Sequence, residues 1–361
     1  MFTGGAREQA SAARPEQSGR MIMNVKNLAG MTVSRRAATA GLLTMAMPIQ
    51  VSAASAATGS AARPSIPHLV HSGAQMAVEL APVHIAMRRL WGESAKFING
   101  GVVDLVGPNR KADLGSNGET QNLFHSVADP SIRILMTIAE GHYPILARQS
   151  AGISSLADLK GKRILSYAHT TAGFFLHKML QRVGLTFDDV TIVETPLGEI
   201  PHVVANKEVD AIAIWEPDSQ QAHWALRHAG EDMLIFSGAD TYHERYNLCT
   251  TAENLADPEK RAQIVAYMRA IIEATRDINS LPAVAREAQE MVARSGGLYT
   301  VAEVAQCFPN VKYVANIDEG LLDVFVEEDV WLAKLDKRQP RTREQLATLI
   351  DRSAYDEAMA L

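Results

Sequence analysis

The chain has little of what several protein classes require. Of its 361 residues, two are cysteines and 6% are aromatic, and the formal charge is −6. Two cysteines exclude a disulfide-dense scaffold and a four-cysteine zinc site, and the lack of any basic run argues against nucleic-acid binding. No segment reaches the ~18 unbroken apolar residues of a membrane-spanning helix. The remaining composition, 47% hydrophobic and 21% charged, is typical of a globular chain of about two domains.

Sequence motifs of common enzyme classes are also absent. There is no G-x-S-x-G, H-E-x-x-H, G-x-x-x-x-G-K-[ST] or G-x-G-x-x-G. The histidine spacings do not suit chelation, since His68 and His71 fall on opposite faces of a strand and His223 and His228 are five residues apart on an expected helix. We therefore predict no catalytic residue, no metal and no cofactor. A catalytic constellation assembled only in space stays open, because triads are spatial rather than sequential.

The N-terminal segment has the layout of an export signal. Ser34-Arg35-Arg36 precedes an apolar run over 37–51, and small residues follow. Charge, a short apolar core and an A-x-A-like site are typical of a secretory signal, and the paired arginines suit the twin-arginine route. We predict that residues 1–56 are a signal cleaved near Ala53 or Ala56, which gives a periplasmic protein. The Sec route, a downstream start codon and a tail with a chance arginine pair are alternatives.

The two cysteines have two interpretations in that compartment. An oxidising periplasm permits a disulfide between Cys249 and Cys307. The other interpretation is a pair of buried free thiols, and the sequence does not decide between them.

Short apolar runs alternate with longer amphipathic segments after residue 66. We expect strands over 67–70, 112–115, 132–138, 163–167, 190–194, 211–215 and 233–236. Helices are expected over 77–90, 120–127, 172–183, 200–205 and 217–228, and then over 258–279, 281–293, 300–308, 319–335 and 342–351. This order predicts an α/β fold with mainly parallel sheets and a helical C-terminal region.

Two extended runs are candidates for crossings between two lobes. They lie over 143–148 and 246–251, about a hundred residues apart, which is enough chain for one lobe. We predict lobe 1 from 64–145 plus 250–361 and lobe 2 from 146–249, with a hinge at the crossings.

Several short motifs in the middle of the chain occur together. They are Lys111-Ala112-Asp113-Leu114-Gly115, Asp158-Leu159-Lys160-Gly161-Lys162, Gly184-Leu185 with Asp189-Val190, Val209-Asp210-Ala211 and Trp215-Glu216-Pro217. In this order the set resembles the solute-binding proteins of ABC importers for nitrate, sulfonates, taurine and thiamine-pyrimidine precursors. The resemblance implies a two-lobed periplasmic-binding-protein-like (type II) fold with a cleft between the lobes. It also implies a monomer that captures a small solute by hinge closure and delivers it to an ABC permease in the inner membrane.

The turns after the expected strands are where a ligand site is expected, because α/β sheets bind ligands outside the carboxyl ends of their strands. The candidate ligand-binding residues in these turns are Ser72, Gln75, Asn117, Glu119, Thr120, Glu140, Tyr143, His169, Thr170, Thr171, Trp215 and Glu216. Thr170 and Thr171 open a helix whose free amides attract anions, and Trp215 offers a flat apolar wall. Each position also has a structural interpretation, such as helix capping for the threonines and lobe core for the tryptophan.

The charges at these positions bear on the class of ligand. Glu119, Glu140 and Glu216 fall in the expected cleft, and the nearest basic residues are Arg148 and Lys111. A bare inorganic anion suits this poorly. A small organic solute with hydroxyl or amino donors suits it better, with sulfonates, aromatic carboxylates and pyrimidines all open.

Two other functions stay open on the same fold. One is a periplasmic sensing module for a membrane receptor. The other is an enzyme, as in the pyrimidine synthases that resemble this family, but those carry a cysteine-rich motif that is absent here.

Overall fold

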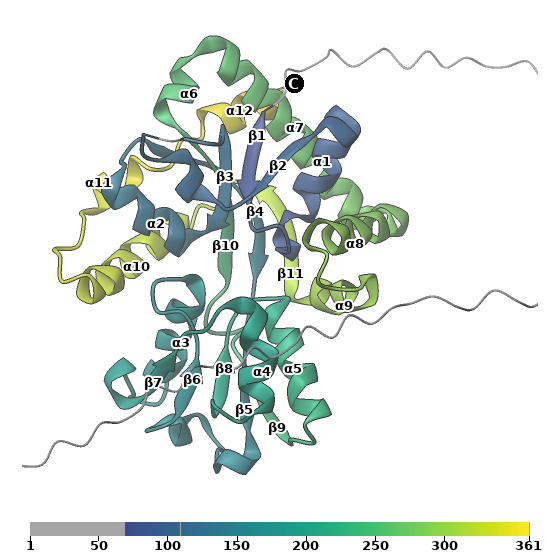
Figure 1. Ribbon diagram of the computed structural model, residues 1–361. Coiled ribbons are helices and arrows are strands. Elements are labelled where there is room, and N and C mark those ends of the chain that lie inside the picture. Colours follow the sequence, from purple (N-terminus) through teal and green to yellow (C-terminus); the bar gives the residue numbers. More distant parts are fainter. Residues whose placement is uncertain (1–68, 109, 361) are drawn as a thin grey trace, which may run out of the picture. The chain divides into compact units, whose positions relative to one another are not determined.

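The computed structural model describes residues 69–108 and 110–360, and the predicted signal over 1–56 lies outside them. Figure 1 shows two β-sheets, one above the other. The first has the order β11-β4-β10-β3-β1-β2 and the second β7-β6-β8-β5-β9. The first sheet consists of β1 (Val70–Gly73), β2 (Lys96–Asn99), β3 (Leu114–Gly118), β4 (Ile132–Gly141), β10 (Glu244–Thr251) and β11 (Val311–Asn316). The second consists of β5 (Pro144–Arg148), β6 (Arg163–Leu165), β7 (Thr191–Val193), β8 (Ala211–Ala213) and β9 (Met233–Ser237).

Both sheets are mixed, which corrects the prediction of mainly parallel sheets. β1 pairs in parallel with β2 and β3, and β6 with β7 and β8. The other five described pairings are antiparallel, and all of them involve β5 or β10 or join β4 to β11. The reason is the path of the chain. It enters the second sheet through β5 and leaves it through β9, and these strands are antiparallel to their neighbours.

The chain passes from the first sheet to the second over 142–143, between β4 and β5, and returns over 238–243, between β9 and β10. The expected extended runs therefore lie next to the two crossings, within β5 and β10. β10 belongs to the first sheet over its whole length, whereas the predicted division places most of it in lobe 2. The division into 64–145 plus 250–361 and 146–249 otherwise stays a prediction.

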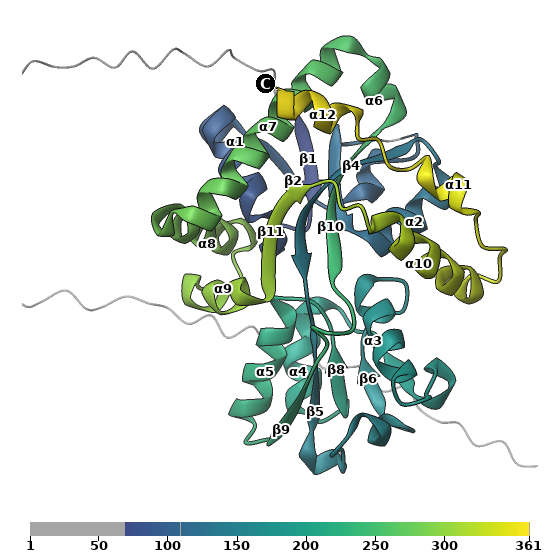
Figure 2. The same ribbon diagram turned by 180° about the vertical axis from the view of Figure 1, so that it is seen from behind.

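Alternating side chains of the second sheet face different helices. Ile145 and Ala147 of β5 belong to the apolar cluster that includes α3 (Thr171–Gln181), while Leu146 between them belongs to the cluster that includes α4 (Ile200–Ala205) and α5 (Asp218–His228). Period-two alternation in a strand buried on both faces places helices on both sides of the sheet. This arrangement directs the start of α3 and the start of α5 toward the first sheet (Figures 1 and 2).

Helices also cover both faces of the first sheet (Figure 2). Their bounds are α1 (Ala81–Trp91), α2 (Glu119–Ala128), α6 (Ala252–Ala256), α7 (Pro258–Ser280), α8 (Pro282–Gly296), α9 (Val301–Cys307), α10 (Leu321–Leu335), α11 (Arg343–Ala347) and α12 (Ser353–Ala360). α1 packs on α7 and α8, whereas α2 packs on α10. Among the described residues, none of these helices combines the length and the apolar character needed to cross a bilayer.

The C-terminal third is helical as predicted, with one exception. The expected helix over 258–279 forms because Asp257 caps it through the amides two and three residues on, Pro258 occupies its first position, and Ile264, Met268 and Ile271 form one buried stripe. β11 is the exception. Alternating Tyr313 and Ala315 are buried there, and this period-two pattern was the available signal for a strand.

Asp329 connects α10 to the chain that follows it and to α2. This carboxylate is fully buried and accepts hydrogen bonds from Arg338 Nη2 at 2.7 Å, Arg341 Nη2 at 2.8 Å and the Arg341 amide at 2.6 Å. Arg341 also donates to Ser126 Oγ and to the Leu123 carbonyl of α2. One buried charge therefore organises the packing of two helices and the loop between α10 and α11.

We expect Asp329→Asn to lower the free energy of unfolding by about 3 kcal/mol, because it leaves two arginines of a largely buried ion pair uncompensated. Asp323→Asn in the same helix is the control. Asp323 pairs with Arg343 in solvent, so its loss should cost less than about 1 kcal/mol. Urea unfolding followed by circular dichroism measures both, and equal effects of the two substitutions would contradict the role given to Asp329.

Candidate functional site

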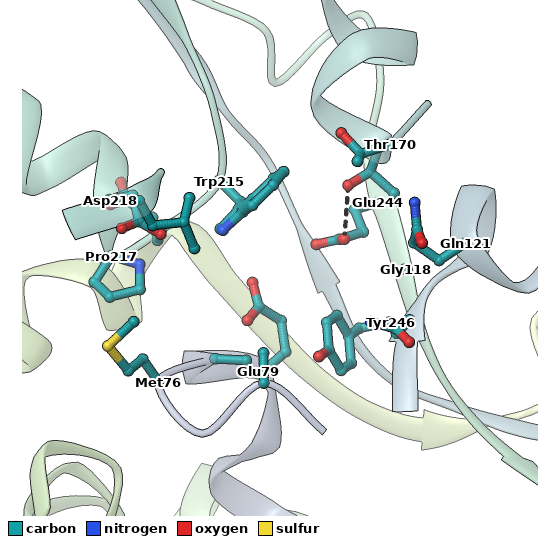
Figure 3. A pocket seen from close by; sticks show the side chains of 16 residues that line it. Met76, Glu79, Gly118, Gln121, Thr170, Trp215, Pro217, Asp218, Glu244 and Tyr246 are labelled. Atoms are coloured by element: carbon teal, nitrogen blue, oxygen red, sulfur yellow. Dashed lines mark hydrogen bonds between the residues drawn. The ribbon is translucent and has the colours of Figure 1, made fainter. Parts of the chain in front are cut away.

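A cavity of about 290 Å³ lies between the two sheets. Residues that lie between the two chain crossings line it together with residues that lie outside them, so its walls belong to both halves of the fold (Figure 3). The lining residues are Ala74, Met76, Ala77, Glu79, Asn117, Gly118, Gln121, Thr170, Thr171, Leu197, Trp215, Glu216, Pro217, Asp218, Glu244 and Tyr246. The cavity therefore forms only when the two halves of the fold lie against each other.

The first-sheet wall is formed by strand ends. Glu79 lies in a single 3₁₀ turn over Val78–Leu80 just after β1, while Glu244 and Tyr246 lie at the start of β10. Gly118 ends β3, and a Cβ built there would lie 2.3 Å from Glu244 Oε1 and 2.4 Å from Thr171 Cγ2. Glycine at 118 is thus required for the contact between these two side chains.

The second-sheet wall is formed by the starts of two helices. Thr171 is the first residue of α3, and its Oγ1 donates to Glu244 Oε1 across the cavity edge at 3.1 Å. Trp215 follows β8 and stacks at an angle on Tyr167, with ring centroids 5.3 Å apart. It is only partly buried, so it serves both as part of the lobe core and as a cavity wall.

Four carboxyl groups face this cavity, and each has a raised pKa. Burial is the largest cause for all four, and it raises the pKa of Glu79 to about 8 and that of Asp218 to about 6. The pKa values of Glu216 and Glu244 are raised for the same reason, with repulsion from neighbouring carboxyls adding to it. At neutral pH the cavity therefore holds protons that exposed glutamates would have released.

Three of these carboxyls accept hydrogen bonds from the opposite half of the fold. Besides the bond from Thr171 to Glu244, Asn310 Nδ2 donates to Glu216 Oε1 at 3.0 Å and Tyr299 OH donates to Asp218 Oδ1 at 3.1 Å. Asn310 and Tyr299 precede β11, so they belong to the first-sheet half. Three polar contacts thus join the two halves beside the cavity.

Glu79 is different, because no other residue in the described ranges donates a hydrogen bond to its carboxyl. Its neighbours are the other three acidic side chains and several tyrosine hydroxyls. The pKa of each of these tyrosines is raised well above 10, chiefly by burial and also by the charge of Glu79. These tyrosines are Tyr143, Tyr246 and Tyr313.

Five of the predicted ligand-binding residues line the cavity. They are Asn117, Thr170, Thr171, Trp215 and Glu216. Thr170 does not cap α3 with its side chain, since its Oγ1 donates to the Tyr167 carbonyl instead. The strand-end rule therefore placed these five correctly, although their role in binding stays a prediction.

Ser72 and Gln75 lie outside the cavity lining. β1 begins three residues later than expected, so Ser72 is inside the strand, where its hydroxyl donates to Asp104 Oδ2 and accepts from the Gly101 amide. Gln75 bonds through its amide to Asn99 Oδ1. Both have local structural partners.

Glu119 and Thr120 lie behind the cavity. β3 extends to Gly118, so both residues begin α2 and face α10. Glu119 accepts from Tyr242 OH at 2.5 Å and from the Arg245 amide at 2.8 Å, and Thr120 Oγ1 donates to Glu328 at 3.1 Å. Burial raises the pKa of Glu119 to about 7, and the charge of Glu119 in turn helps to raise the pKa of Glu244.

The other three predicted residues also lie outside the lining. Glu140 pairs with Lys312 at 3.1 Å on the far side of β4. Tyr143 is buried behind the wall, with its hydroxyl 3.3 Å from Thr171 Oγ1. The side chain of His169 is nearly half exposed and lies beside Asp336.

Glu79, Asp218, Glu244 and Tyr246 are cavity residues that the strand-end rule did not identify. Asp218 lies two residues after Glu216 in the same turn, which was an available signal. Glu244 and Tyr246 belong to an antiparallel strand whose beginning, not its end, meets the cavity. Nothing in the local pattern around Glu79 distinguishes it from an ordinary helix residue.

The described residues contain no group of three or more His, Cys, Asp or Glu side chains arranged to hold a metal ion. Cys249 and Cys307 are both buried free thiols, so the structure does not form the disulfide alternative. Burial raises the pKa of each thiol.

A family model and several curated proteins match parts of this chain. A family model described as "NMT1/THI5 like" matches residues 99–285. A protein of Brucella abortus (strain 2308), provisionally described as a binding protein, is 35% identical over 66 residues, which is 18% of this chain and 21% of that protein. The chain thus aligns with about a fifth of the length of the curated relatives it matches.

Solved structures resemble the chain over much more of its length. The periplasmic aliphatic sulphonate binding protein SsuA from Escherichia coli is 18% identical, with a TM-score of 0.60 over 77% of this chain and 91% of that one. The desulfurization enzyme DszB is 13% identical, with a TM-score of 0.54 over 81% and 99%. These similarities confirm the two-lobed periplasmic-binding-protein-like fold, and they show that this fold carries both binding proteins and an enzyme.

We expect Glu79→Gln to raise the unfolding temperature at pH 8 and to change it little at pH 5. The folded-state pKa of about 8 exceeds the ordinary 4.5, so the unfolded chain binds fewer protons between these values. The free energy of unfolding therefore falls as the pH rises through this window. Glutamine removes that penalty. Thermal unfolding at both pH values measures it, with the exposed Glu93→Gln as control, and a shift of equal size at both pH values would contradict the interpretation.

Proposed function

Since the chain belongs to the NMT1/THI5-like family, we propose that it is the extracytoplasmic substrate-binding component of an ABC-type importer. It captures a small organic solute between its two lobes and delivers the solute to a permease in the inner membrane. We propose that it acts as a monomer and binds no nucleic acid.

The observation that supports this function best is the composition of the cavity wall. Residues of both halves, such as Glu79 and Trp215, face one cavity of about 290 Å³. A solute in that space contacts both halves at once, so it stabilises the closed arrangement relative to an open one. Recognition of the closed form by a permease requires no covalent step.

The polar contacts across the cavity suit reversible closure. The bonds of Asn310 with Glu216, and of Thr171 with Glu244, exchange for bonds to water when the halves separate. Such exchange costs little net free energy per hydrogen bond, about 1 kcal/mol. The free energy of solute binding can then decide which arrangement prevails.

The start of α3 argues against a bare anion as the solute. The hydroxyl of its first residue, Thr171, already donates to the Glu244 carboxyl, so it is not free to bind a sulfonate or carboxylate there. Among the described residues that line the cavity, none is Lys, Arg or His. An organic solute that carries hydrogen-bond donors suits the site better than nitrate does.

The enzyme alternative has one specific observation in its favour, the similarity to DszB. A cysteine nucleophile needs an accessible thiol with a lowered pKa. Cys249 and Cys307 are buried, and burial raises the pKa of each. A sensing module for a membrane receptor would use the same cavity, and dependence of uptake on a permease distinguishes it from a transport component.

We expect Trp215→Ala to abolish the rise in unfolding temperature that a bound solute causes. The probes are taurine, benzenesulfonate, benzoate, 4-aminopyrimidine, benzylamine and nitrate. A bound probe at a hundred times its dissociation constant contributes about 2.7 kcal/mol. Trp224→Ala in α5, outside the cavity lining, is the matched control and should preserve the shift. Equal loss in both variants would show that the shift does not report on this cavity.

We expect the full-length chain to be exported and shortened when it is expressed in a Gram-negative host. N-terminal sequencing of the periplasmic fraction should give a product that begins at residue 54 or 57, after Ala53 or Ala56. Replacing Arg35 and Arg36 with lysines should block export by the twin-arginine route and leave Sec export intact. An unprocessed cytoplasmic product from the unmodified chain would contradict the predicted signal.

A further inference from the structure

The cavity contains acidic groups without basic ones. Glu79, Glu216, Asp218 and Glu244 all line it, and no described lining residue carries a positive charge. Nearby cations have other partners: Arg245 Nε donates to Asp318 Oδ2 at 2.8 Å, and Lys312 pairs with Glu140. The described residues that line the cavity therefore contribute no positive charge against this group of carboxyls.

Glu244 provides an independent indication of a missing ligand. Its side chain is 3% exposed and Oε1 accepts from Thr171, but Oε2 has no hydrogen-bond partner among the described residues. The Tyr143 hydroxyl is a hydrogen-bonding neighbour that lowers the pKa of this carboxyl, although the contact it makes within hydrogen-bond distance is to Thr171 Oγ1, at 3.3 Å. Figure 3 shows the second oxygen of Glu244 directed toward Trp215, within the cavity. A buried acceptor that stays unpaired destabilises the fold.

Glu79 and Glu244 face the same corner of the cavity. A Cβ built on Gly141 would lie 3.5 Å from Glu79 Oε1 and 3.3 Å from Glu244 Oε2. The two oxygens are thus near one another, although the residues come from different elements. A donor group that enters this corner would therefore have both carboxyls beside it.

Aromatic rings line the space beside these two carboxyls. Trp215 and Tyr246 flank Glu79 and Glu244 in Figure 3. The face of an aromatic ring attracts a cation, most strongly when water is excluded. Carboxylates and ring faces together form a site that favours a positive organic group over a neutral or a negative one.

We propose that the solute is a small organic cation with N–H donors, a protonated amine or amidine, whose charged head lies between Glu79 and Glu244 against Trp215. This inference rests on the proposed function and names the class of its substrate. The N–H groups would supply the donor that Glu244 Oε2 lacks, and the positive charge would relieve the repulsion between the two carboxyls.

A neutral solute bound to protonated carboxyls is the competing explanation. Burial raises the pKa of Glu79 to about 8, so the empty site holds protons at neutral pH. A cation would expel them on binding, whereas a neutral solute would not. Proton release on binding therefore separates the two explanations.

The experiment compares matched probes that differ only in their head group. Phenyl and butyl skeletons each carry an ammonium, a hydroxyl, a carboxylate or a sulfonate: benzylamine, benzyl alcohol, benzoate and benzenesulfonate, with butylamine, butanol, butyrate and butanesulfonate. Calorimetry with the exported protein, in two buffers of different ionisation enthalpy, measures affinity and proton release. We expect an amine to bind at least about tenfold more tightly than its alcohol and to release protons.

Glu244→Gln should weaken amine binding at least about tenfold while leaving the alcohol unchanged, and the exposed Glu93→Gln should change neither. Unfolding temperatures confirm that each variant is folded. Tighter binding of an alcohol, carboxylate or sulfonate would overturn the cation inference but leave the binding function standing. No binding by any member of either series would count against both.

Discussion

The burial of acidic side chains between two sheets is the constraint on which the rest of this site depends. Four carboxyl groups face one small cavity where little water screens their charges, and burial raises the pKa of each. They belong to Glu79, Glu216, Asp218 and Glu244. Desolvation penalises each charge, and proximity penalises several together. These buried carboxyls lower the local stability of the fold. Such a loss of stability is expected at a site that binds a ligand.

Hydrogen bonds that these buried carboxyls accept also hold the two halves of the fold together. Asn310, Tyr299 and Thr171 each donate to a carboxyl on the opposite half. Apolar contacts join the halves as well, since one buried cluster contains both Ile132 and Phe174, and the Phe174 ring centroid lies 5.3 Å from that of Trp331. The same three carboxyls therefore take part in closure and in shaping the cavity, whereas Glu79 takes part only in the second. Elsewhere a buried carboxylate has full partners, as Asp329 does where it joins α10 to α2 through two arginines.

Sequence reasoning succeeded where local pattern and tertiary position coincide. The helix over Ile200–Ala205 has the predicted bounds, and Thr170, Thr171 and Trp215 line the cavity because they follow strands of the second sheet as expected. It failed where a strand end was misplaced. β3 continues for three residues beyond its predicted end, so Glu119 begins a helix that faces α10 instead of the cavity. Side-chain direction changes with every residue, so a small error in a boundary is enough to move a residue from one face to another.

By itself, the sequence determined the class of fold, the alternation of strands and helices, the helical C-terminal region and the family, since periodicity and short motifs are local properties of the chain. Only the tertiary structure decided the charge of the cavity. Glu79 and Glu244 are far apart in the sequence, and their carboxyls meet because β1 and β10 are placed in one sheet, on either side of β3. Strand order and register arise from packing of the whole fold. The acidic corner that most narrows the choice of solute is therefore not visible in any segment of the sequence alone.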